Sequence, residues 1–459
     1  MNMKNIFLSI LLSVLSLILL SAYKHKRKGT IYTDSSAKPN IVLFFVDDLG
    51  WSDLGFRNSI FETPNIDKLS KAGIRFEQAY IACPTCSPSR GTLLTGKHPA
   101  RLQLVRHIPG DEDVSEFNYL DSDPAHFPSR NWLPLEHTTY AEALKKQGYY
   151  NFFIGKWHLG PKNFYPDKQG FDEQIGVTDF GNPGSYYPPY FFDSNLFPDN
   201  NHSYLTDKLT DKAVGFIETY SKVKPFMLSF WYYAVHTPHE GRTDLLEHFK
   251  EKGLEEEYAN YVAMVKAVDE SVGKVLEALK KRGIDQETII IFLSDQGGCF
   301  ENKPFRGGKS GGTALYEGGA RVPFFFYWPG ITKPNTINNS IVQSTDLFPT
   351  LVELVGGKVS NYKDIDGISL LPVIKENKTL QRDAIFGYRA YEDLYASVRS
   401  DNWKLLAYRS GKMELYNLTE DIKEQVNLVD ENRAKVKELV LKLVKWEKEM
   451  GVEKYSGIK

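Results

Sequence analysis

Pairs of oxygen-bearing side chains follow two apolar runs that lie far apart in the sequence. Asp47 and Asp48 come directly after NIVLFFV, and Asp295 and Gln296 come directly after TIIIFLS. Carboxylate and amide oxygens are the ligands that Ca²⁺ and Mg²⁺ prefer, whereas Zn²⁺ is usually bound by His and Cys. Three carboxylates without a cation would repel one another. The pairs therefore predict a site for one hard divalent cation, although each pair alone could instead cap a neighbouring helix.

Positively charged or protonatable side chains accompany these oxygen ligands. Lys156 and His158 lie in GKWHLG, His236 in HTPH and Lys309 in RGGKSGG. A lone lysine or histidine is usually solvated or structural, but the glycines beside the two lysines would let the backbone approach a ligand closely. Several cations beside a divalent metal suit an oxyanion ester, and phosphate and sulfate esters are the natural candidates.

The elements that must position these residues have an α/β pattern. NIVLFFV, KPFMLSFW and TIIIFLS are continuous apolar runs typical of strands buried on both faces, and TTYAEALKKQG predicts a helix that ends at Gly148. Ligands bind beyond the carboxyl ends of strands in open parallel sheets, so several strand ends could converge on one site. We expect a large, mixed but mostly parallel sheet sandwiched by helices.

A smaller unit is predicted after this sheet. The runs DAIFGYR, YASVRS, WKLLAYR and MELYNL predict short antiparallel strands, and a helix follows with Val436, Leu439, Val440 and Leu443 on one face. We therefore expect a catalytic domain over 39–375 and a C-terminal subdomain over 376–459, the latter a small antiparallel sheet with a closing helix.

The N-terminus predicts export. An apolar, serine-punctuated run follows Lys4 and ends near Ala22, which is typical of a signal peptide (1–22) followed by a basic and polar linker (23–38). An uncleaved anchor is the alternative, because basic residues follow the run directly. We expect a periplasmic or extracellular protein. The net charge of -2 gives no electrostatic footprint for nucleic acid.

Two of the three cysteines lie in ACPTCSPSRGTLLTGK. Cys83 and Cys86 have the spacing of a thioredoxin-type pair, but that motif usually opens a helix in a small βαβ domain. The run from Cys86 to Arg90, with its continuation GTLLTGK, closely resembles the signature of the type I, formylglycine-dependent sulfatases: Cys or Ser, any residue, Pro, a small residue and Arg, then a helix. The resemblance extends from Pro39 to ELYNLTEDIKEQVNL.

This resemblance implies a role for each candidate residue. Cys86 is the residue that a maturation enzyme oxidises to formylglycine, whose hydrate attacks sulfur with one hydroxyl and later helps expel sulfate with the other. Arg90 orients that hydrate. One Ca²⁺ is held by an oxygen of the modified Cys86 together with four side chains, Asp47, Asp48, Asp295 and Gln296. Sulfate binding falls to Lys156, His158 and Lys309, one of which could protonate the leaving alcohol. His236 lies beside the leaving oxygen and is the other candidate for the general acid.

Two features qualify the resemblance. The family most often has Asn where this chain has Gln296, whose amide oxygen can still bind Ca²⁺ through a longer arm. Cys83 and Cys299 remain once Cys86 is modified. They could form a disulfide in an oxidising compartment, but two separate buried thiols are the favoured interpretation.

The expected substrate is a sulfated polysaccharide or oligosaccharide. PARLQLVRHIPG resembles the substrate-facing region of sulfatases that act on polysaccharides and glycosaminoglycans, so Arg106 and His107 are candidate sugar contacts or, equally, loop residues without contact. Three alternatives stay open: a phosphate ester hydrolase of the same alkaline-phosphatase-like superfamily, a non-catalytic protein that binds sulfated glycans, and a thiol–disulfide protein that uses Cys83 and Cys86.

Overall fold

The computed structural model describes most of the chain after the N-terminal segment. The described residues are 38–110, 115–191, 196–197, 203–309 and 312–458. The predicted signal peptide and all but the last residue of the linker lie outside them. Pro39–Lys459 form one compact unit. Of the helices in the described residues, none is long and apolar enough to cross a membrane.

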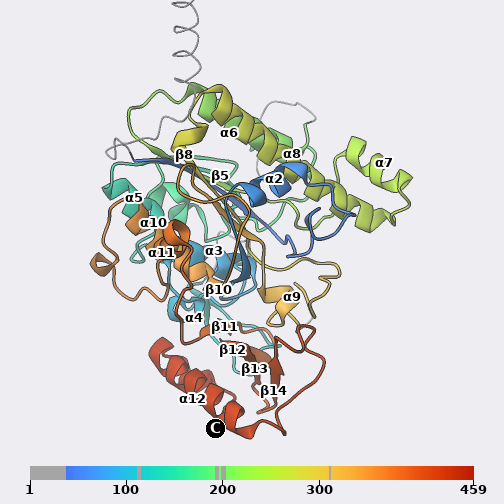
Figure 1. The fold of residues 1–459 in the computed structure, drawn as a ribbon, viewed down its shortest axis with the longest axis vertical. Coiled ribbons are helices and arrows are strands. Elements are labelled where there is room, and N and C mark those ends of the chain that lie inside the picture. Colours follow the sequence, from blue (N-terminus) through green and yellow to red (C-terminus); the bar gives the residue numbers. More distant parts are fainter. Residues whose placement is uncertain (1–37, 111–114, 192–195, 198–202, 310–311, 459) are drawn as a thin grey trace, which may run out of the picture. The chain divides into compact units, whose positions relative to one another are not determined.

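A mixed, mostly parallel sheet runs through this unit (Figure 1). β1 pairs in parallel with β7 on one side and with β8 on the other, whereas β9 is antiparallel to both β2 and β8. Within the described part of the chain, the strand order is β10-β2-β9-β8-β1-β7-β5-β6. The strands are β1 (Asn40–Val46), β2 (Ile74–Tyr80), β5 (Tyr150–Gly155), β6 (Glu173–Ile175), β7 (Phe226–Trp231), β8 (Thr288–Ser294), β9 (Phe324–Tyr327) and β10 (Thr336–Gln343).

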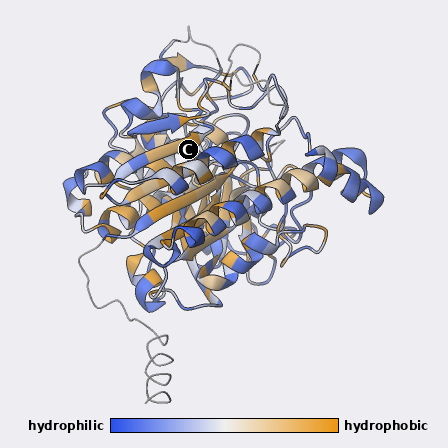
Figure 2. Cartoon of the chain, turned by 90° about the horizontal axis from the view of Figure 1, so that it is seen from above, coloured by the Kyte–Doolittle hydropathy of each residue, from blue (hydrophilic) through white to orange (hydrophobic). Residues whose placement is uncertain are grey.

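Both faces of the sheet are buried because its central strands are apolar at nearly every position. Val42 and Phe44 of β1 pack into one hydrophobic core, and Ile41 and Leu43 pack into the other. α2, α6 and α8 cover the first face, with α7 packed on α8, and α3, α5, α10 and α11 cover the second. Figure 2 shows apolar strands in the interior beneath helices with hydrophilic outer surfaces. The predicted sandwich is confirmed.

The helices of the described residues vary widely in length, and the longest, α8, spans 26 residues. They are α2 (Pro64–Ala72), α3 (Cys86–Thr95), α4 (Pro99–Leu102), α5 (Tyr140–Lys146), α6 (Leu205–Thr219), α7 (Thr243–Glu251), α8 (Glu256–Lys281), α9 (Glu317–Ala320), α10 (Leu347–Leu354), α11 (Leu371–Glu376) and α12 (Arg433–Met450).

A second, antiparallel sheet forms the C-terminal part, as predicted. Its strands pair in chain order: β11 (Ile385–Tyr388), β12 (Leu394–Ser400), β13 (Trp403–Tyr408) and β14 (Met413–Asn417). α12 packs on this sheet through a stripe that includes Leu439, Leu443 and Trp446. A short hairpin of β3 (Phe117–Asn118) and β4 (Ser129–Arg130) lies in the loop after α4. The C-terminal sheet thus lies next to the segment around α3 and α4: the backbone N–H of Tyr388 donates to the carbonyl of Ala82, and Ala100 packs in the same core as the sheet.

Candidate active site

The carboxyl ends of neighbouring strands bring the predicted site residues together. β8, β1, β7 and β5 are consecutive in the sheet, and Val46 pairs with Ser294 where β1 and β8 end. Asp47 and Asp295 therefore leave the sheet side by side, and Lys156 follows the end of β5. Polar groups at this edge of a parallel sheet face a common ligand. The strand ends thus converge as the sequence predicts.

α3 brings the cysteine motif to this edge. The helix begins at Cys86, and all its residues are buried. Arg90 lies four residues on and hence on the same side of the helix as Cys86. Gly96 ends the helix in the left-handed region (φ 67°), where an added Cβ would lie 2.7 Å from Cβ of Phe348. The helix therefore points its electropositive N-terminus at the strand ends and is held there by packing at the other end.

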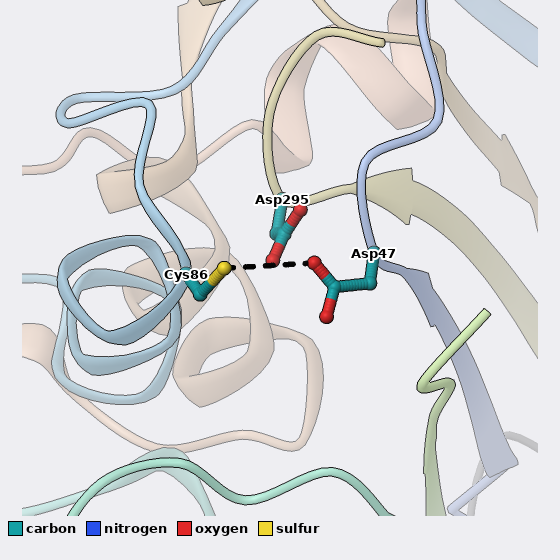
Figure 3. A group of neighbouring side chains, drawn as sticks. All are labelled: Asp47, Cys86 and Asp295. Atoms are coloured by element: carbon teal, nitrogen blue, oxygen red, sulfur yellow. Dashed lines mark hydrogen bonds between the residues drawn. The ribbon is translucent and has the colours of Figure 1, made fainter. Parts of the chain in front are cut away.

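Three buried ligand-type atoms meet where the strands and α3 adjoin. One ligand atom each of Asp47, Cys86 and Asp295 lies within 4.8 Å of the other two. Figure 3 shows the three side chains pointing toward one another, and Sγ of Cys86 lies 3.7 Å from Oδ1 of Asp47. The backbone N–H of Asp48 donates to Oδ1 of Asp295 (3.0 Å). Gln296 Nε2 donates to Asp48 Oδ1 (2.6 Å) and Cys86 Sγ (3.4 Å).

The donor chemistry of this cluster fits a hard divalent cation. Burial, and then the charge of Asp47, raises the pKa of Asp295 well above its usual value, which reflects carboxylates packed together in a site shielded from water. A cation would relieve that repulsion. The Gln296 amide faces Asp48 with its nitrogen, and a half-turn of the amide would present its oxygen instead. The residues therefore match the oxygen-rich ligand set of Ca²⁺.

Cations surround the carboxylates on several sides. Nη2 of Arg90 lies 3.1 Å from Oδ2 of Asp295 and 3.3 Å from Oδ2 of Asp47. Lys156 forms an ion pair with Asp47, and Lys309 forms one with Asp48. Burial alone would raise the pKa of Asp47, but Lys156 and Arg90 hold it well below its usual value. The site thus contains a positive shell that can accept an anion.

The predicted residues differ in their exposure. The side chains of Arg90 and Lys156 are fully buried, whereas those of His236 and Lys309 are 14% and 23% exposed. Nε2 of His236 lies 3.9 Å from Oδ2 of Asp48. Burial lowers the pKa of His236, but the charge of Asp48 outweighs it and the net shift is upward. His236 and Lys309 therefore lie on the side of the site that opens to solvent.

His158 lies deeper than His236 and is held by the backbone. Its Nε2 forms a hydrogen bond with the carbonyl oxygen of Ile108 (2.8 Å), and its Nδ1 is buried without a partner among the described residues. Burial, and then the charge of Lys156, lowers the pKa of His158 well below its usual value. Burial therefore favours the neutral imidazole, in which Nε2 carries the proton donated to Ile108 and Nδ1 is a hydrogen-bond acceptor.

The two candidate sugar contacts have different surroundings. Arg106 is 2% exposed, and all five of its N–H groups are directed at protein acceptors, which are Asn118, Asp123, Phe127 and Ala390. It therefore has no donor left for a sugar, which favours the second of the two expectations, a loop residue without substrate contact. Its role is to join the loop after α4 to the C-terminal sheet. His107 is exposed, and its backbone N–H and ring contact the hydroxyl of Tyr391.

The cysteines form no disulfide. Cys83, Cys86 and Cys299 are free thiols, so Cys83 and Cys299 are separate as expected, but Cys299 is only partly buried. Burial raises the pKa of Cys83 to about 12, which makes it a poor nucleophile. For Cys86, burial and Asp47 raise the pKa, but Lys156, His236 and Lys309 outweigh them and the net shift is downward. The surroundings therefore raise the pKa of Cys83 and lower that of Cys86.

One group of residues near the site was missed in the sequence. The turn between β11 and β12 brings Arg389, Tyr391 and Glu392 against the loop that carries His107. The only signal was the polar cluster RAYED between two predicted strands of the C-terminal sheet. A contact between residues 284 positions apart cannot be inferred from that pattern.

Comparison with known proteins places this geometry in a family. The family model described as Sulfatase matches residues 39–357, and that described as N-sulphoglucosamine sulphohydrolase, C-terminal, matches 312–450. N-acetylgalactosamine-6-sulfatase of Mus musculus is 32% identical over 393 residues, covering 79% of this chain and 71% of that protein. A sulfatase of Formosa agariphila is 32% identical over 479 residues, covering 87% and 86%.

The fold is shared with solved structures. The crystal structure of Ps i-CgsB in complex with k-i-k-neocarrahexaose is similar with a TM-score of 0.78 and 31% identity, covering 91% of this chain and 94% of that chain. The matched region includes both strand ends, the cysteine motif and the lysines of the site. The chain therefore belongs to the sulfatase family and is a sulfuric ester hydrolase.

Proposed function

We propose that this sulfatase hydrolyses sulfate esters on a sulfated polysaccharide or oligosaccharide. The observation that carries the proposal is the buried cluster of Asp47, Cys86 and Asp295 beneath a shell of cations, because it can hold a metal, a nucleophile and a sulfate group together. A carbohydrate substrate is supported by the relative named N-acetylgalactosamine-6-sulfatase and by the structure that contains neocarrahexaose.

The chemistry requires a Ca²⁺ ion and a formylglycine derived from Cys86. Asp47, Asp48, Asp295 and Gln296 would hold the ion, which neutralises charge on the sulfate, and the hydrated aldehyde at position 86 supplies the hydroxyl nucleophile. The site has the required oxygen ligands in one place, and α3 begins at Cys86 with its electropositive end toward the reacting group.

The remaining residues bind and orient the sulfate and manage the proton. Lys156 and Lys309 would contact sulfate oxygens from the buried side and the open side. His158 would line the sulfate site with an Nδ1 that accepts hydrogen bonds and does not donate them, because its Nε2–H is already donated to Ile108. Arg90 holds the N-terminal turn of α3 against Asp47 and Asp295. His236 is 14% exposed beside Asp48, where a protonated Nε2 can donate to the leaving alcohol oxygen as the S–O bond breaks.

Two further expectations belong to this proposal. A formylglycine-generating maturation enzyme is the partner that converts Cys86. The N-terminal segment would direct export to the periplasm or the cell exterior, where sulfated polysaccharides are encountered.

The decisive experiment compares matured and unmatured protein. The chain is co-expressed with a formylglycine-generating enzyme, the peptide containing Cys86 is weighed after trapping with a hydrazine reagent, and sulfate release from sulfated oligosaccharides is measured. We expect an aldehyde at position 86 and sulfate release that is lost in Cys86→Ala. Release of phosphate from phosphate esters at a higher kcat/KM than sulfate would instead support the phosphate ester hydrolase. An intact thiol in active protein would contradict the proposal.

A further inference from the structure

The turn between β11 and β12 reaches the site from the C-terminal sheet. The hydroxyl of Tyr391 accepts a hydrogen bond from the backbone N–H of His107 (2.8 Å) and lies 2.6 Å from its Nδ1. The two rings stack at 5.8 Å with an angle of 19°. Arg106 donates to the carbonyl of Ala390 (3.0 Å), and Ser122 donates to the carbonyl of Tyr391 (2.7 Å). The turn is therefore held in place on two sides.

This attachment places the turn beside the reacting groups. Ile108 follows His107, and its backbone N–H donates to Oγ of Ser87 (3.0 Å), the residue after Cys86. The carbonyl oxygen of Ile108 is bonded to Nε2 of His158. The loop from Arg106 to Ile108 thus connects α3 and the sulfate-binding histidine on one side with Tyr391 on the other.

Arg389 lies on the inner side of this turn and lacks hydrogen-bond acceptors. It is 6% exposed, and its guanidinium carbon lies 4.6 Å from the centre of the Tyr391 ring. Nε and Nη1 are buried and have no hydrogen-bond partner among the described residues. Oε1 of Glu392 lies 3.7 Å from Nη1, which is near enough for charge attraction but too long for a hydrogen bond. Leaving a charged donor unpaired costs several kcal/mol, so this guanidinium is suited to an added partner.

Glu392 lies close to the segment that follows Lys309. A methyl group added at Gly312 would lie 3.7 Å from Cγ of Glu392. Gly312 belongs to the RGGKSGG segment that carries Lys309, whose side chain is partly exposed. The turn that carries Arg389 and Glu392 thus contacts the His107 loop on one side and approaches Gly312, three residues after Lys309, on the other.

We infer that Arg389, assisted by Tyr391 and Glu392, forms a subsite for a second anionic group, a sulfate or a carboxylate, on the carbohydrate whose sulfate ester is hydrolysed. The inference rests on the proposed function. A guanidinium binds planar or tetrahedral oxyanions through paired N–H groups, and it stays charged when buried. Glu392 can accept a hydrogen bond from a sugar hydroxyl, and the Tyr391 ring provides an apolar surface beside it. Arg389 is thus a specificity-determining residue outside the sulfatase signature.

The test measures selectivity in matured enzyme with Ca²⁺. One substrate pair is neocarrageenan oligosaccharides with one or two sulfates per disaccharide. The other is a 6-sulfated chondroitin disaccharide with its uronic acid carboxylate intact or reduced to an alcohol. We expect wild type to prefer the doubly anionic member of one pair, which identifies the group as sulfate or carboxylate. In Arg389→Gln the ratio of kcat/KM between the two members should fall at least about tenfold, and Arg389→Lys should retain part of it.

Two controls distinguish an effect of Arg389 on substrate binding from an effect on folding. Arg433→Ala removes an exposed arginine of α12 whose side chain is 83% exposed, and it should leave the ratio unchanged. Thermal unfolding of each variant reports whether the fold is retained. An Arg389→Gln enzyme that loses activity on both members equally, or a wild type that prefers neither doubly anionic member, overturns the inference.

A wild type that hydrolyses no sulfate ester refutes the proposed function instead. In that case, calorimetric titration of the same oligosaccharides still tests the subsite. Tighter binding of the doubly anionic member by wild type than by Arg389→Gln would support it, and equal binding would overturn it.

Discussion

Nη2 of Arg90 lies 3.1 Å from Oδ2 of Asp295, although the two residues are 205 positions apart in the chain. The same nitrogen also lies 3.3 Å from Asp47, and Nη1 donates to the carbonyl of Lys156 (2.8 Å). One buried guanidinium therefore links α3 to the ends of β1, β5 and β8. This contact holds the site residues in position and also neutralises part of the negative charge of the carboxylates.

Replacing Arg90 should damage both stability and catalysis. In Arg90→Met the carboxylates of Asp47 and Asp295 would lose their shared partner, and breaking a buried pair in this way costs about 3 to 5 kcal/mol. We expect a lower free energy of unfolding in denaturant titration and loss of sulfate release. Arg90→Lys keeps the charge but not the planar fork, so it should recover part of the stability and little activity. Full activity in either variant would contradict this role.

Removal of divalent cations should reversibly inactivate the enzyme. Asp47, Asp48 and Asp295 repel one another without an ion, so a chelator should lower both sulfate release and the unfolding temperature. Binding at a free Ca²⁺ concentration about 100 times the Kd adds about 3 kcal/mol to stability. Scanning calorimetry and activity are measured before chelation, after it, and after Ca²⁺ is restored. If neither quantity responds to exhaustive chelation, the metal assignment is wrong.

Arg106 should matter for stability rather than for sugar binding. Arg106→Gln leaves the carbonyls of Phe127 and Ala390 without a donor and removes one partner of Asp123, which should cost about 3 kcal/mol. Denaturant unfolding measures this loss, with Arg433→Ala as the exposed control. KM for an oligosaccharide substrate, measured well below the unfolding temperature, should stay near the wild-type value. A large rise in KM without loss of stability would restore Arg106 as a sugar contact.

Cys83 should be dispensable for catalysis. Its thiol is buried, its pKa is raised to about 12, and its Sγ lies 3.8 Å from the carbonyl oxygen of Val105. Cys83→Ala should keep sulfate release within about twofold of wild type, because a buried neutral thiol has little reactivity. Cys86→Ala provides the contrasting inactive variant. Equal inactivation of both variants would revive a dithiol mechanism.

Glu424 should make the folded protein less stable as the pH rises. Its carboxylate accepts a hydrogen bond from the backbone N–H of Glu317 (2.7 Å) and shares Lys404 with Glu317. Burial raises its pKa from 4.5 to about 7, aided by the charge of Glu317 and opposed by Lys404. The folded state therefore holds a proton that the unfolded state has lost, and the corresponding stability, present below pH 4.5, is lost as the pH rises to about 7.

Glu424→Gln tests that sign directly. Glutamine cannot ionise, so the variant should gain stability over wild type as the pH rises, by about 3 kcal/mol above pH 7. Urea unfolding at several pH values measures the difference. Glu449→Gln changes an exposed carboxylate of α12 and serves as the control. A difference between wild type and Glu424→Gln that is independent of pH would contradict the shift.

The sequence predicted the parts of this site that depend on local pattern. Asp47 and Asp295 follow apolar runs, and such runs become buried parallel strands whose ends meet. The antiparallel insertion of β9 between β2 and β8 could not be predicted, because strand order is decided by packing between distant segments. The choice between the two expectations for Arg106 could not be made from the sequence for a related reason. An arginine in a polar loop has the same sequence appearance whether it faces solvent or bonds five buried acceptors.

The burial of Cys86 at the start of α3 limits when the proposed oxidation to formylglycine can take place. In the folded chain it is 5% exposed, and Gln296, which covers its sulfur, is 210 residues further along. The thiol can therefore become enclosed only after β8 has been synthesised. At ordinary elongation rates, that leaves roughly 10 to 40 seconds in which an enzyme can reach position 86 on the nascent chain. The yield of active enzyme then depends on the rate of oxidation relative to the rate of folding. Slower translation should therefore raise the fraction of chains with an aldehyde at position 86, measured by mass spectrometry.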